Sequence, residues 1–183
     1  MTRIIAGSAR GRSLKVPASA RPTADRVRES VFTALEHRLG SFEGLSVLDL
    51  FAGSGALALE ALSRGAASAM AVESDRKAAD VIRNNAQALG LPLRLHVQDA
   101  LKAVAVSSPA AFDVVFADPP YEGLREEQVS ALVHDLIGNG WLAEGGWLVL
   151  ERSSRKPKLA LPPGAVEVQE RKYGDTTVIL ACW

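Results

Sequence analysis

Leu45-Ser-Val-Leu-Asp-Leu-Phe-Ala-Gly-Ser-Gly55 is an apolar run that leads into a short loop with two glycines. The apolar part, residues 45–51, has the length and composition of a buried β-strand. Glycine in the loop lets the backbone approach a ligand closely. A helical pattern follows over residues 56–64 and ends at Gly65. The stretch therefore predicts the first strand, loop and helix of a nucleotide-binding βαβ unit.

The second strand of this unit is expected over residues 66–73 and ends in an acid. Glu73 lies 20 positions after Gly53, the spacing of a carboxylate that binds ribose hydroxyls. The run Gly53-x-Gly55-x-x-Ala58 also fits the dinucleotide fingerprint. The unit alone therefore leaves two classes open, an NAD-dependent dehydrogenase and an enzyme that uses another adenosine cofactor.

Strands and helices alternate along the rest of the chain. This alternation predicts an α/β fold with a doubly wound, mostly parallel sheet and a terminal antiparallel hairpin. Further strands are expected over residues 91–97, 111–115, 147–151, 166–173 and 176–183. Three helices are expected: one capped by Ser74 or Asp75 and running to Leu89, one over residues 100–106 and one over residues 126–137. Asp99 either caps the second of these helices or accepts a hydrogen bond from an adenine amine.

The first forty residues predict an extension that precedes the βαβ unit. Residues 2–6 and 12–16 are short runs around a glycine-bearing loop and predict a β-hairpin with Arg10 and Arg12 at its tip. A helix follows, with Thr23 or Asp25 as its N-cap. Its buried stripe is expected at Val27, Val31, Leu35 and Leu39, with Phe32 beside them. We divide the chain into an N-terminal extension of hairpin and helix, residues 1–42, and a nucleotide-binding domain, residues 43–183.

The turn Phe116-Ala-Asp-Pro-Pro-Tyr121 stands at the carboxyl end of a predicted buried strand, where open α/β sheets bind ligands. The two prolines fix the backbone. Asp118 and the Pro119 carbonyl offer acceptors for the two N–H groups of a planar amine, and Tyr121 offers a ring for stacking. Taking both protons into hydrogen bonds holds the nitrogen lone pair toward an electrophile. The turn therefore predicts a site for an exocyclic amine.

Composition limits the class of protein. A hydrophobic content of 48% and a charged content of 23% are ordinary for a globular chain. No apolar stretch reaches the roughly 18 residues of a membrane span, and the N-terminus lacks a signal-like apolar region. We therefore expect a cytoplasmic protein. The single cysteine and the three histidines have no metal-ligand spacing, so no metal site is expected.

The zero net charge hides an uneven distribution. Residues 1–24 contain five bases and no acid, and residues 152–158 contain four bases. Between Leu45 and Leu150 there are 7 bases and 13 acids. Basic flanks on an acidic body predict a surface for a polyanion.

Three blocks in this order resemble the seven-stranded Rossmann-like methyltransferases that use S-adenosylmethionine. They are Asp49-Leu-Phe-Ala-Gly-Ser-Gly-Ala56, Glu73 and Asp118-Pro-Pro-Tyr121. The resemblance implies a seven-stranded, mostly parallel sheet and S-adenosylmethionine as cofactor.

Three further blocks are similar to those of the RsmD family, which methylates N2 of a guanine in bacterial small-subunit (16S) rRNA. They are Arg3-Ile-Ile-Ala-Gly7, Arg21-Pro-Thr-x-Asp-Arg-Val-Arg-Glu29 and Tyr173-Gly-Asp-Thr176. The partner implied is 16S rRNA, within the small ribosomal subunit or its precursor. Nothing in the sequence requires a dimer, so we expect a monomer that does not bind membranes.

The resemblance also implies a role for each matching residue. The cofactor would be held by Asp49, Phe51, Ala52, Gly53, Ser54, Gly55, Glu73, Ser74, Asp99 and Ala100. The flipped guanine would be received by Asp118, Pro119, Pro120 and Tyr121. The rRNA would be bound by Arg3, Arg10, Arg12, Arg21, Arg26 and Arg28.

Two alternatives stay open beside this reading and the dehydrogenase. The turn does not discriminate among amines, so the chain could methylate adenine N6 or cytosine N4 in RNA or DNA. A non-catalytic RNA-binding assembly factor with the same fold is the other alternative. Mapping of the modified base separates the enzymes, and detectable turnover excludes the assembly factor.

Overall fold

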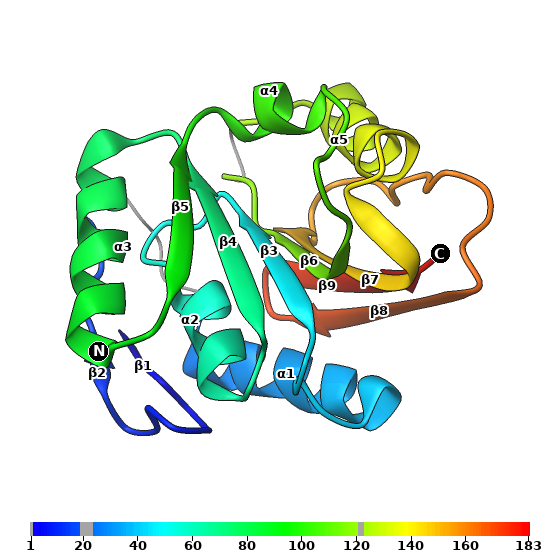
Figure 1. The fold of residues 1–183 in the computed structure, drawn as a ribbon. Helices are drawn as coiled ribbons and strands as arrows, with labels where there is room; N and C mark the ends of the chain where they lie inside the picture. The colour runs from blue at the N-terminus through cyan, green and yellow to red at the C-terminus, as the bar shows by residue number, and fades with distance from the viewer. Residues whose placement is uncertain (1, 19–23, 121–122) are drawn as a thin grey trace.

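The computed structural model describes residues 2–18, 24–120 and 123–183, in which strands and helices alternate (Figure 1). The strands are β1 (Thr2–Arg3), β2 (Ser13–Leu14), β3 (Ser46–Leu50), β4 (Ser68–Glu73), β5 (Leu93–Val97), β6 (Phe112–Ala117), β7 (Leu142–Ser153), β8 (Glu167–Tyr173) and β9 (Thr176–Cys182). The helices are α1 (Asp25–Leu39), α2 (Ala56–Ser63), α3 (Arg76–Leu89), α4 (Ala100–Val104) and α5 (Glu126–Gly138).

The centre of the molecule is a seven-stranded sheet in the order β5-β4-β3-β6-β7-β9-β8. The strands from β5 to β7 are parallel, and β9 runs antiparallel to both of its neighbours. This confirms the predicted doubly wound sheet with a terminal hairpin. Within the described residues, no helix is long and apolar enough to cross a membrane.

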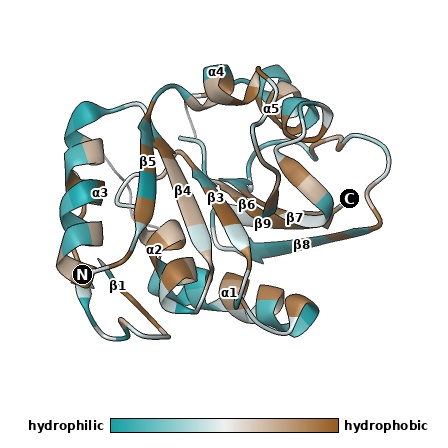
Figure 2. Cartoon of the chain, in the orientation of Figure 1, coloured by the Kyte–Doolittle hydropathy of each residue, from teal (hydrophilic) through white to brown (hydrophobic). Residues whose placement is uncertain are grey.

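Two hydrophobic clusters pack the helices on opposite faces of the sheet. Helices α1 and α2 pack on one face, over the inner strands and β9. Helices α4 and α5 pack on the other face. In Figure 2 the strands at the centre of the sheet are largely brown, while the outer side of α3 is teal. Helices on both faces leave only the edges of the sheet open, and the carboxyl edge carries the loops after β3, β4 and β6.

An aromatic group fixes α1 above the strand that carries the Asp-Pro-Pro turn. The ring of Phe32 in α1 lies 5.0 Å from that of Phe42 and 5.4 Å from that of Phe116 in β6. All three side chains are buried. The predicted apolar stripe of α1 is confirmed by Val31, Phe32 and Leu35, whereas Val27 and Leu39 are partly buried. The helix therefore shares its core with the central sheet.

Two predictions of element ends were wrong. Asp25 is the first residue of α1 and follows Ala24, which makes no side-chain cap, so Asp25 is not the N-cap; Thr23 lies outside the described residues. The strand predicted over 147–151 is the inner part of a longer β7, which runs from Leu142 to Ser153. Its pairing with β6 jumps from Phe112↔Leu142 to Val114↔Trp147. The inserted residues interrupt the apolar run, which hid the start of the strand.

The N-terminal hairpin is confirmed but has only two residues in each strand. Its loop rests on the C-terminal end of α2. The Ser8 N–H donates to the Ser63 carbonyl at 2.8 Å, and the Ala9 N–H donates to the Ser63 hydroxyl at 2.9 Å. Because α2 has eight residues, these contacts lie about 12 Å from the glycine loop at its other end.

A buried carboxylate ties the same hairpin to α1 and α2. Glu60 is fully buried and accepts from the Ile5 and Ala6 N–H groups at 2.8 and 3.0 Å. Its carboxylate also accepts from Arg64 at 2.8 Å and lies 3.9 Å from Arg28 Nε. A buried charge is tolerated only with such partners. The network therefore fixes where the first strand meets the body of the protein.

We expect Gly7→Ala to detach the hairpin. Gly7 has φ +79°, and a Cβ atom there would lie 1.7 Å from the Ser63 carbonyl oxygen. The clash and the left-handed backbone together are expected to lower the free energy of unfolding by about 3 kcal/mol. Gly11→Ala is the matched control, because Gly11 has φ +80° with nothing within 4 Å, and about 1 kcal/mol is expected. Urea denaturation measures both, and equal losses would contradict the contact.

Candidate active site

The loop after β3 carries a rare backbone conformation. Phe51 has φ +60°, which a bulky residue seldom adopts and which concentrates at functional sites. The loop is closed by the Gly55 N–H, which donates to the Ala52 carbonyl at 2.7 Å. Gly55 itself has φ +76°, and a Cβ atom there would lie 3.2 Å from Ile82. The chain therefore turns sharply from β3 into α2, and the loop between them lies at the carboxyl edge of the sheet.

Glu73 stands beside this loop at the end of the neighbouring strand. Its two carboxylate oxygens accept from the Gly53 N–H and the Asp75 N–H, each at 2.8 Å. The half-buried side chain thereby fixes the height of the glycine loop against β4. The placement agrees with the spacing that predicted a βαβ unit.

The other predicted cofactor residues lie along the same edge. Ser74 is exposed next to Glu73, and Ala100 is buried at the start of α4. Asp99 is exposed and caps α4 by accepting from the Lys102 N–H at 3.0 Å. Of the two roles left open for Asp99, the structure shows the cap. Glu73 pairs with Val97 in the sheet, so Asp99 follows just beyond that pair.

Asp49 is a buried carboxyl at the end of β3. It is 1% exposed, and its Oδ2 accepts from the Ala58 N–H at 3.1 Å. Burial raises the pKa of Asp49 from 3.8 to about 8; the Ala58 hydrogen bond lowers it, and the charges of Asp118 and Glu73 raise it further. The charges of carboxyl groups at the ends of the two neighbouring strands therefore act on Asp49.

The Asp-Pro-Pro turn follows directly after β6. In the sheet Asp49 pairs with Phe116 and Leu50 with Ala117, which places Asp118 just past the end of β3. Pro119 is buried and Pro120 exposed. The Gly123 N–H donates to the Pro120 carbonyl at 2.9 Å and closes the turn. Tyr121, the predicted stacking ring, lies outside the described residues.

A small cavity lies on the inner side of this turn. Its volume is about 20 Å³, and Arg28, Asp118 and Glu151 are among its lining residues. This volume holds about one water molecule, so a nucleobase does not fit. The exposed side of the turn is at Pro120.

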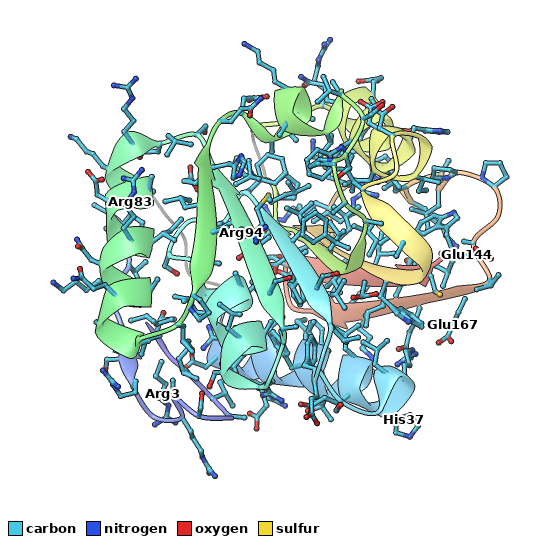
Figure 3. The ribbon with its side chains drawn as sticks, viewed as in Figure 1. Arg3, His37, Arg83, Arg94, Glu144 and Glu167 are labelled. Carbon is cyan, nitrogen blue, oxygen red and sulfur yellow. The ribbon has the colours of Figure 1, made fainter. Side chains whose placement is uncertain are left out.

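The predicted RNA-binding arginines are not equivalent. Arg3, Arg10, Arg12 and Arg26 are exposed; Arg12 donates to the Ala88 carbonyl at the end of α3. Figure 3 shows Arg3 at the hairpin end of the molecule, far from α4 and α5. Arg21 lies outside the described residues.

The structure corrects the prediction that Arg28 lies on the surface. It is 1% exposed and donates to the Arg3 carbonyl and to Asp25 Oδ1, the latter at 3.0 Å. Its contacts hold β1 against α1, and a phosphate group cannot reach it without breaking them. Arg28 is therefore buried and holds β1 against α1, and it does not lie on the exposed surface where the prediction placed it.

Sequence reasoning also missed Asn85. This buried side chain donates to the Ser54 carbonyl in the glycine loop at 3.0 Å and to the Lys15 carbonyl at 2.9 Å. It accepts from the Lys15 N–H at 2.9 Å. The residue stands on the same face of α3 as Ala78 and Ile82, so a polar residue within an apolar stripe was the available signal.

Comparison with known proteins identifies the family. Residues 2–182 match the family model described as Conserved hypothetical protein 95. Over 152 residues the chain is 41% identical to Ribosomal RNA small subunit methyltransferase D of Escherichia coli strain K12, covering 81% of this chain and 73% of that protein. The chain belongs to the RsmD family.

Solved structures agree with the RsmD assignment. The structure of yhhF from Escherichia coli superposes with a TM-score of 0.86 at 35% identity, over 99% of this chain and 97% of that one. The Thermus thermophilus 16S rRNA N2 G1207 methyltransferase RsmC, in complex with AdoMet and guanosine, has a TM-score of 0.69 at 24% identity, over 91% of this chain and 45% of that one. At that identity the second comparison shows the fold alone.

Proposed function

We propose that this RsmD-family chain transfers a methyl group from S-adenosylmethionine to the exocyclic N2 amine of a guanine in 16S rRNA. The observation that carries the proposal is the position of Asp118. It follows β6, which pairs with the strand of Asp49, and that strand pairs in turn with the strand of Glu73. Members of the family include rRNA small-subunit methyltransferases. The substrate is expected within the small ribosomal subunit or its precursor, and the enzyme is expected to act as a monomer.

The residues at the cofactor edge suit a cation. Asp118 and Glu73 both raise the pKa of Asp49 because their negative charges oppose its ionisation. A positively charged sulfonium or ammonium group favours all three carboxylates in their charged forms. The pyrophosphate of NAD is an anion and would be repelled here. The charge pattern therefore supports S-adenosylmethionine and disfavours the dehydrogenase alternative.

Asp118 orients the nucleophile. When bound, S-adenosylmethionine supplies an electrophilic methyl group on a positively charged sulfur. A guanine amine is a weak nucleophile because its lone pair is delocalised into the ring. Asp118 accepts an N–H of the amine, aligns the nitrogen and stabilises the positive charge that grows on it. The amine proton then leaves to water. The base must first be unstacked from the RNA.

We expect the purified protein to place a labelled methyl group on a guanine of small-subunit rRNA that lacks the modification. Naked rRNA, partially assembled particles and whole subunits are compared side by side, and the modified base is mapped by mass spectrometry. A label on adenine N6 or cytosine N4 would replace the guanine assignment by the other enzyme reading. No turnover on any of the substrates, with RNA bound, would favour the assembly factor.

A further inference from the structure

A basic pocket lies at the carboxyl end of β7. It has a volume of about 110 Å³ and is bounded by the end of β7, the chain after it, and β8 and β9. Four bases and a single acid line it, together with hydroxyl groups. The bases are Arg152, Lys156, Lys158 and Lys172, and the acid is Glu170. Three of these bases belong to the 152–158 run that the sequence singles out, and none belongs to the predicted RNA-binding set.

Arg152 is a buried guanidinium with an unused donor. The residue is 6% exposed and donates from Nη2 to the Glu126 carboxylate. Its Nε is buried, and no acceptor for it exists among the described residues. A buried N–H without an acceptor costs about 1–3 kcal/mol. An anion seated in the pocket that Arg152 lines would supply the missing acceptor.

The lysines of the pocket have only weak partners. Lys156 lies 3.8 Å from Glu126, and Lys158 lies 3.9 Å from Glu170. Such long, partly exposed pairs contribute little and exchange readily for a better partner. Lys172 is exposed and forms no ion pair within the described part of the chain. The pocket therefore carries excess positive charge that a multivalent anion can use.

The pocket lies at the same carboxyl edge of the sheet as the Asp-Pro-Pro turn, on the face that α4 and α5 cover, whereas Asp118 faces α1. Ala117 pairs with Leu150, so Asp118, directly after β6, and Glu151 on β7 follow at the same level, and Arg152 comes next. Glu126, which holds Arg152, opens α5 shortly after the turn. From β6 to β8 there are three strand spacings, or about 14 Å. By contrast, the hairpin loop contacts the far end of α2.

We propose that this pocket binds a backbone phosphate of the RNA close to the nucleotide whose base enters the Asp118 turn. This inference rests on the proposed function and adds to it a second contact. Arginine and lysine are the residues that bind phosphate oxygens in proteins. The pocket fixes the register of the strand without reading its sequence. The pocket would add a phosphate contact on the face of the sheet opposite to α1 and the hairpin.

The test is the double variant Lys158→Gln and Lys172→Gln, with Arg83→Gln and Arg94→Gln as a control that removes the same charge. Arg83 and Arg94 are exposed on α3 and β5 (Figure 3). Binding of a small-subunit rRNA fragment is measured by fluorescence anisotropy at several salt concentrations. The pocket variant is expected to bind about 10-fold more weakly, with a salt slope smaller by about 1. The control is expected to stay within about twofold of the wild type in both quantities.

Kinetics with rRNA complete the test, together with a titration of inorganic phosphate in which the thermal stability of the protein is measured. KM for rRNA is expected to rise about 10-fold in the pocket variant, with kcat within about twofold and S-adenosylmethionine binding unchanged, because phosphate binding is uniform along the reaction. Circular dichroism checks folding, and Lys172→Gln alone replaces the double variant where it is unfolded.

Three results would overturn the inference. One is unchanged RNA affinity and salt slope in the pocket variant while the wild type methylates rRNA. Another is equal weakening in the control. The third is stabilisation by inorganic phosphate that the variant loses while its RNA binding is unaffected, which would make the pocket a small-anion site. Absence of methylation in the wild type, with the RNA-binding difference present, would instead count against the proposed function alone.

Discussion

Asp118→Ala is expected to slow methyl transfer by about 10³-fold while S-adenosylmethionine binds within a few-fold of its wild-type affinity. The turn keeps its shape in this variant, because the Pro119 and Pro120 rings and the Gly123–Pro120 hydrogen bond hold it without the carboxylate. What is lost is the acceptor that aligns the amine. The predicted cofactor residues lie at the carboxyl ends of β3, β4 and β5 and are unchanged in this variant.

Asp118→Asn is the matched control for this prediction. The amide keeps one acceptor oxygen of nearly the same size and position, so we expect activity within about 10-fold of the wild type. Single-turnover rates with saturating cofactor, together with calorimetric titration of S-adenosylmethionine, separate chemistry from binding. Full activity of Asp118→Ala would dispose of the site assignment, and loss of cofactor affinity in both variants would move Asp118 into the cofactor site.

The type and order of the elements could be predicted from local signals, because breaks in the pattern separate the helices from the strands. Gly40 and Gly90 follow α1 and α3 with positive φ, as the breaks in the pattern indicated. Asp75 caps α3 by accepting from the Lys77 N–H at 2.8 Å. Short apolar runs between such breaks are buried strands in an α/β chain. The predicted cofactor residues lie at one edge of the sheet, because the carboxyl ends of neighbouring parallel strands meet there.

The charged residues of the interior could not be predicted, because their partners are distant in sequence. Glu60 and Arg28 look like surface residues when each helix is read alone. Glu60 is paired with backbone N–H groups more than fifty residues away, and Arg28 with the carbonyl of Arg3. A sequence pattern shows that a side chain is charged but not that the fold supplies its partner. The arginine cluster at the start of α1 was therefore assigned to RNA as a whole, and part of it is structural.

The position of the basic residues relative to the site was equally hidden. Two basic flanks could be counted, but only the register of β6, β7 and β9 shows that residues 152–158 follow a strand end at the same edge as Asp118. The hairpin and the 152–158 run lie at different ends of the sheet. Charge composition predicts that a polyanion binds, and topology decides where its phosphates can reach.

Asp49→Asn is expected to weaken cofactor binding and to stabilise the protein without cofactor. Asp49 has a pKa of about 8 in the folded chain and 3.8 as its ordinary value. Between these two values the unfolded chain is ionised while the folded chain holds the proton, so folding costs more as pH rises from about 4 to about 8. At pH 7 the cost is on the order of 4 kcal/mol. Asparagine carries no such cost and still offers an oxygen to the Ala58 N–H.

The variant should therefore gain unfolding free energy at pH 7–8, and the gain should vanish near pH 4. Urea denaturation across this range measures the difference. Cofactor affinity should respond in the opposite direction, since the ionised carboxylate is the form that binds a cation. Wild-type affinity for S-adenosylmethionine is expected to rise from pH 6 to pH 8, and Asp49→Asn to bind about 10–100-fold more weakly with a flat pH profile. A variant that binds the cofactor as the wild type does, with the same pH dependence, would show that Asp49 faces no positive charge.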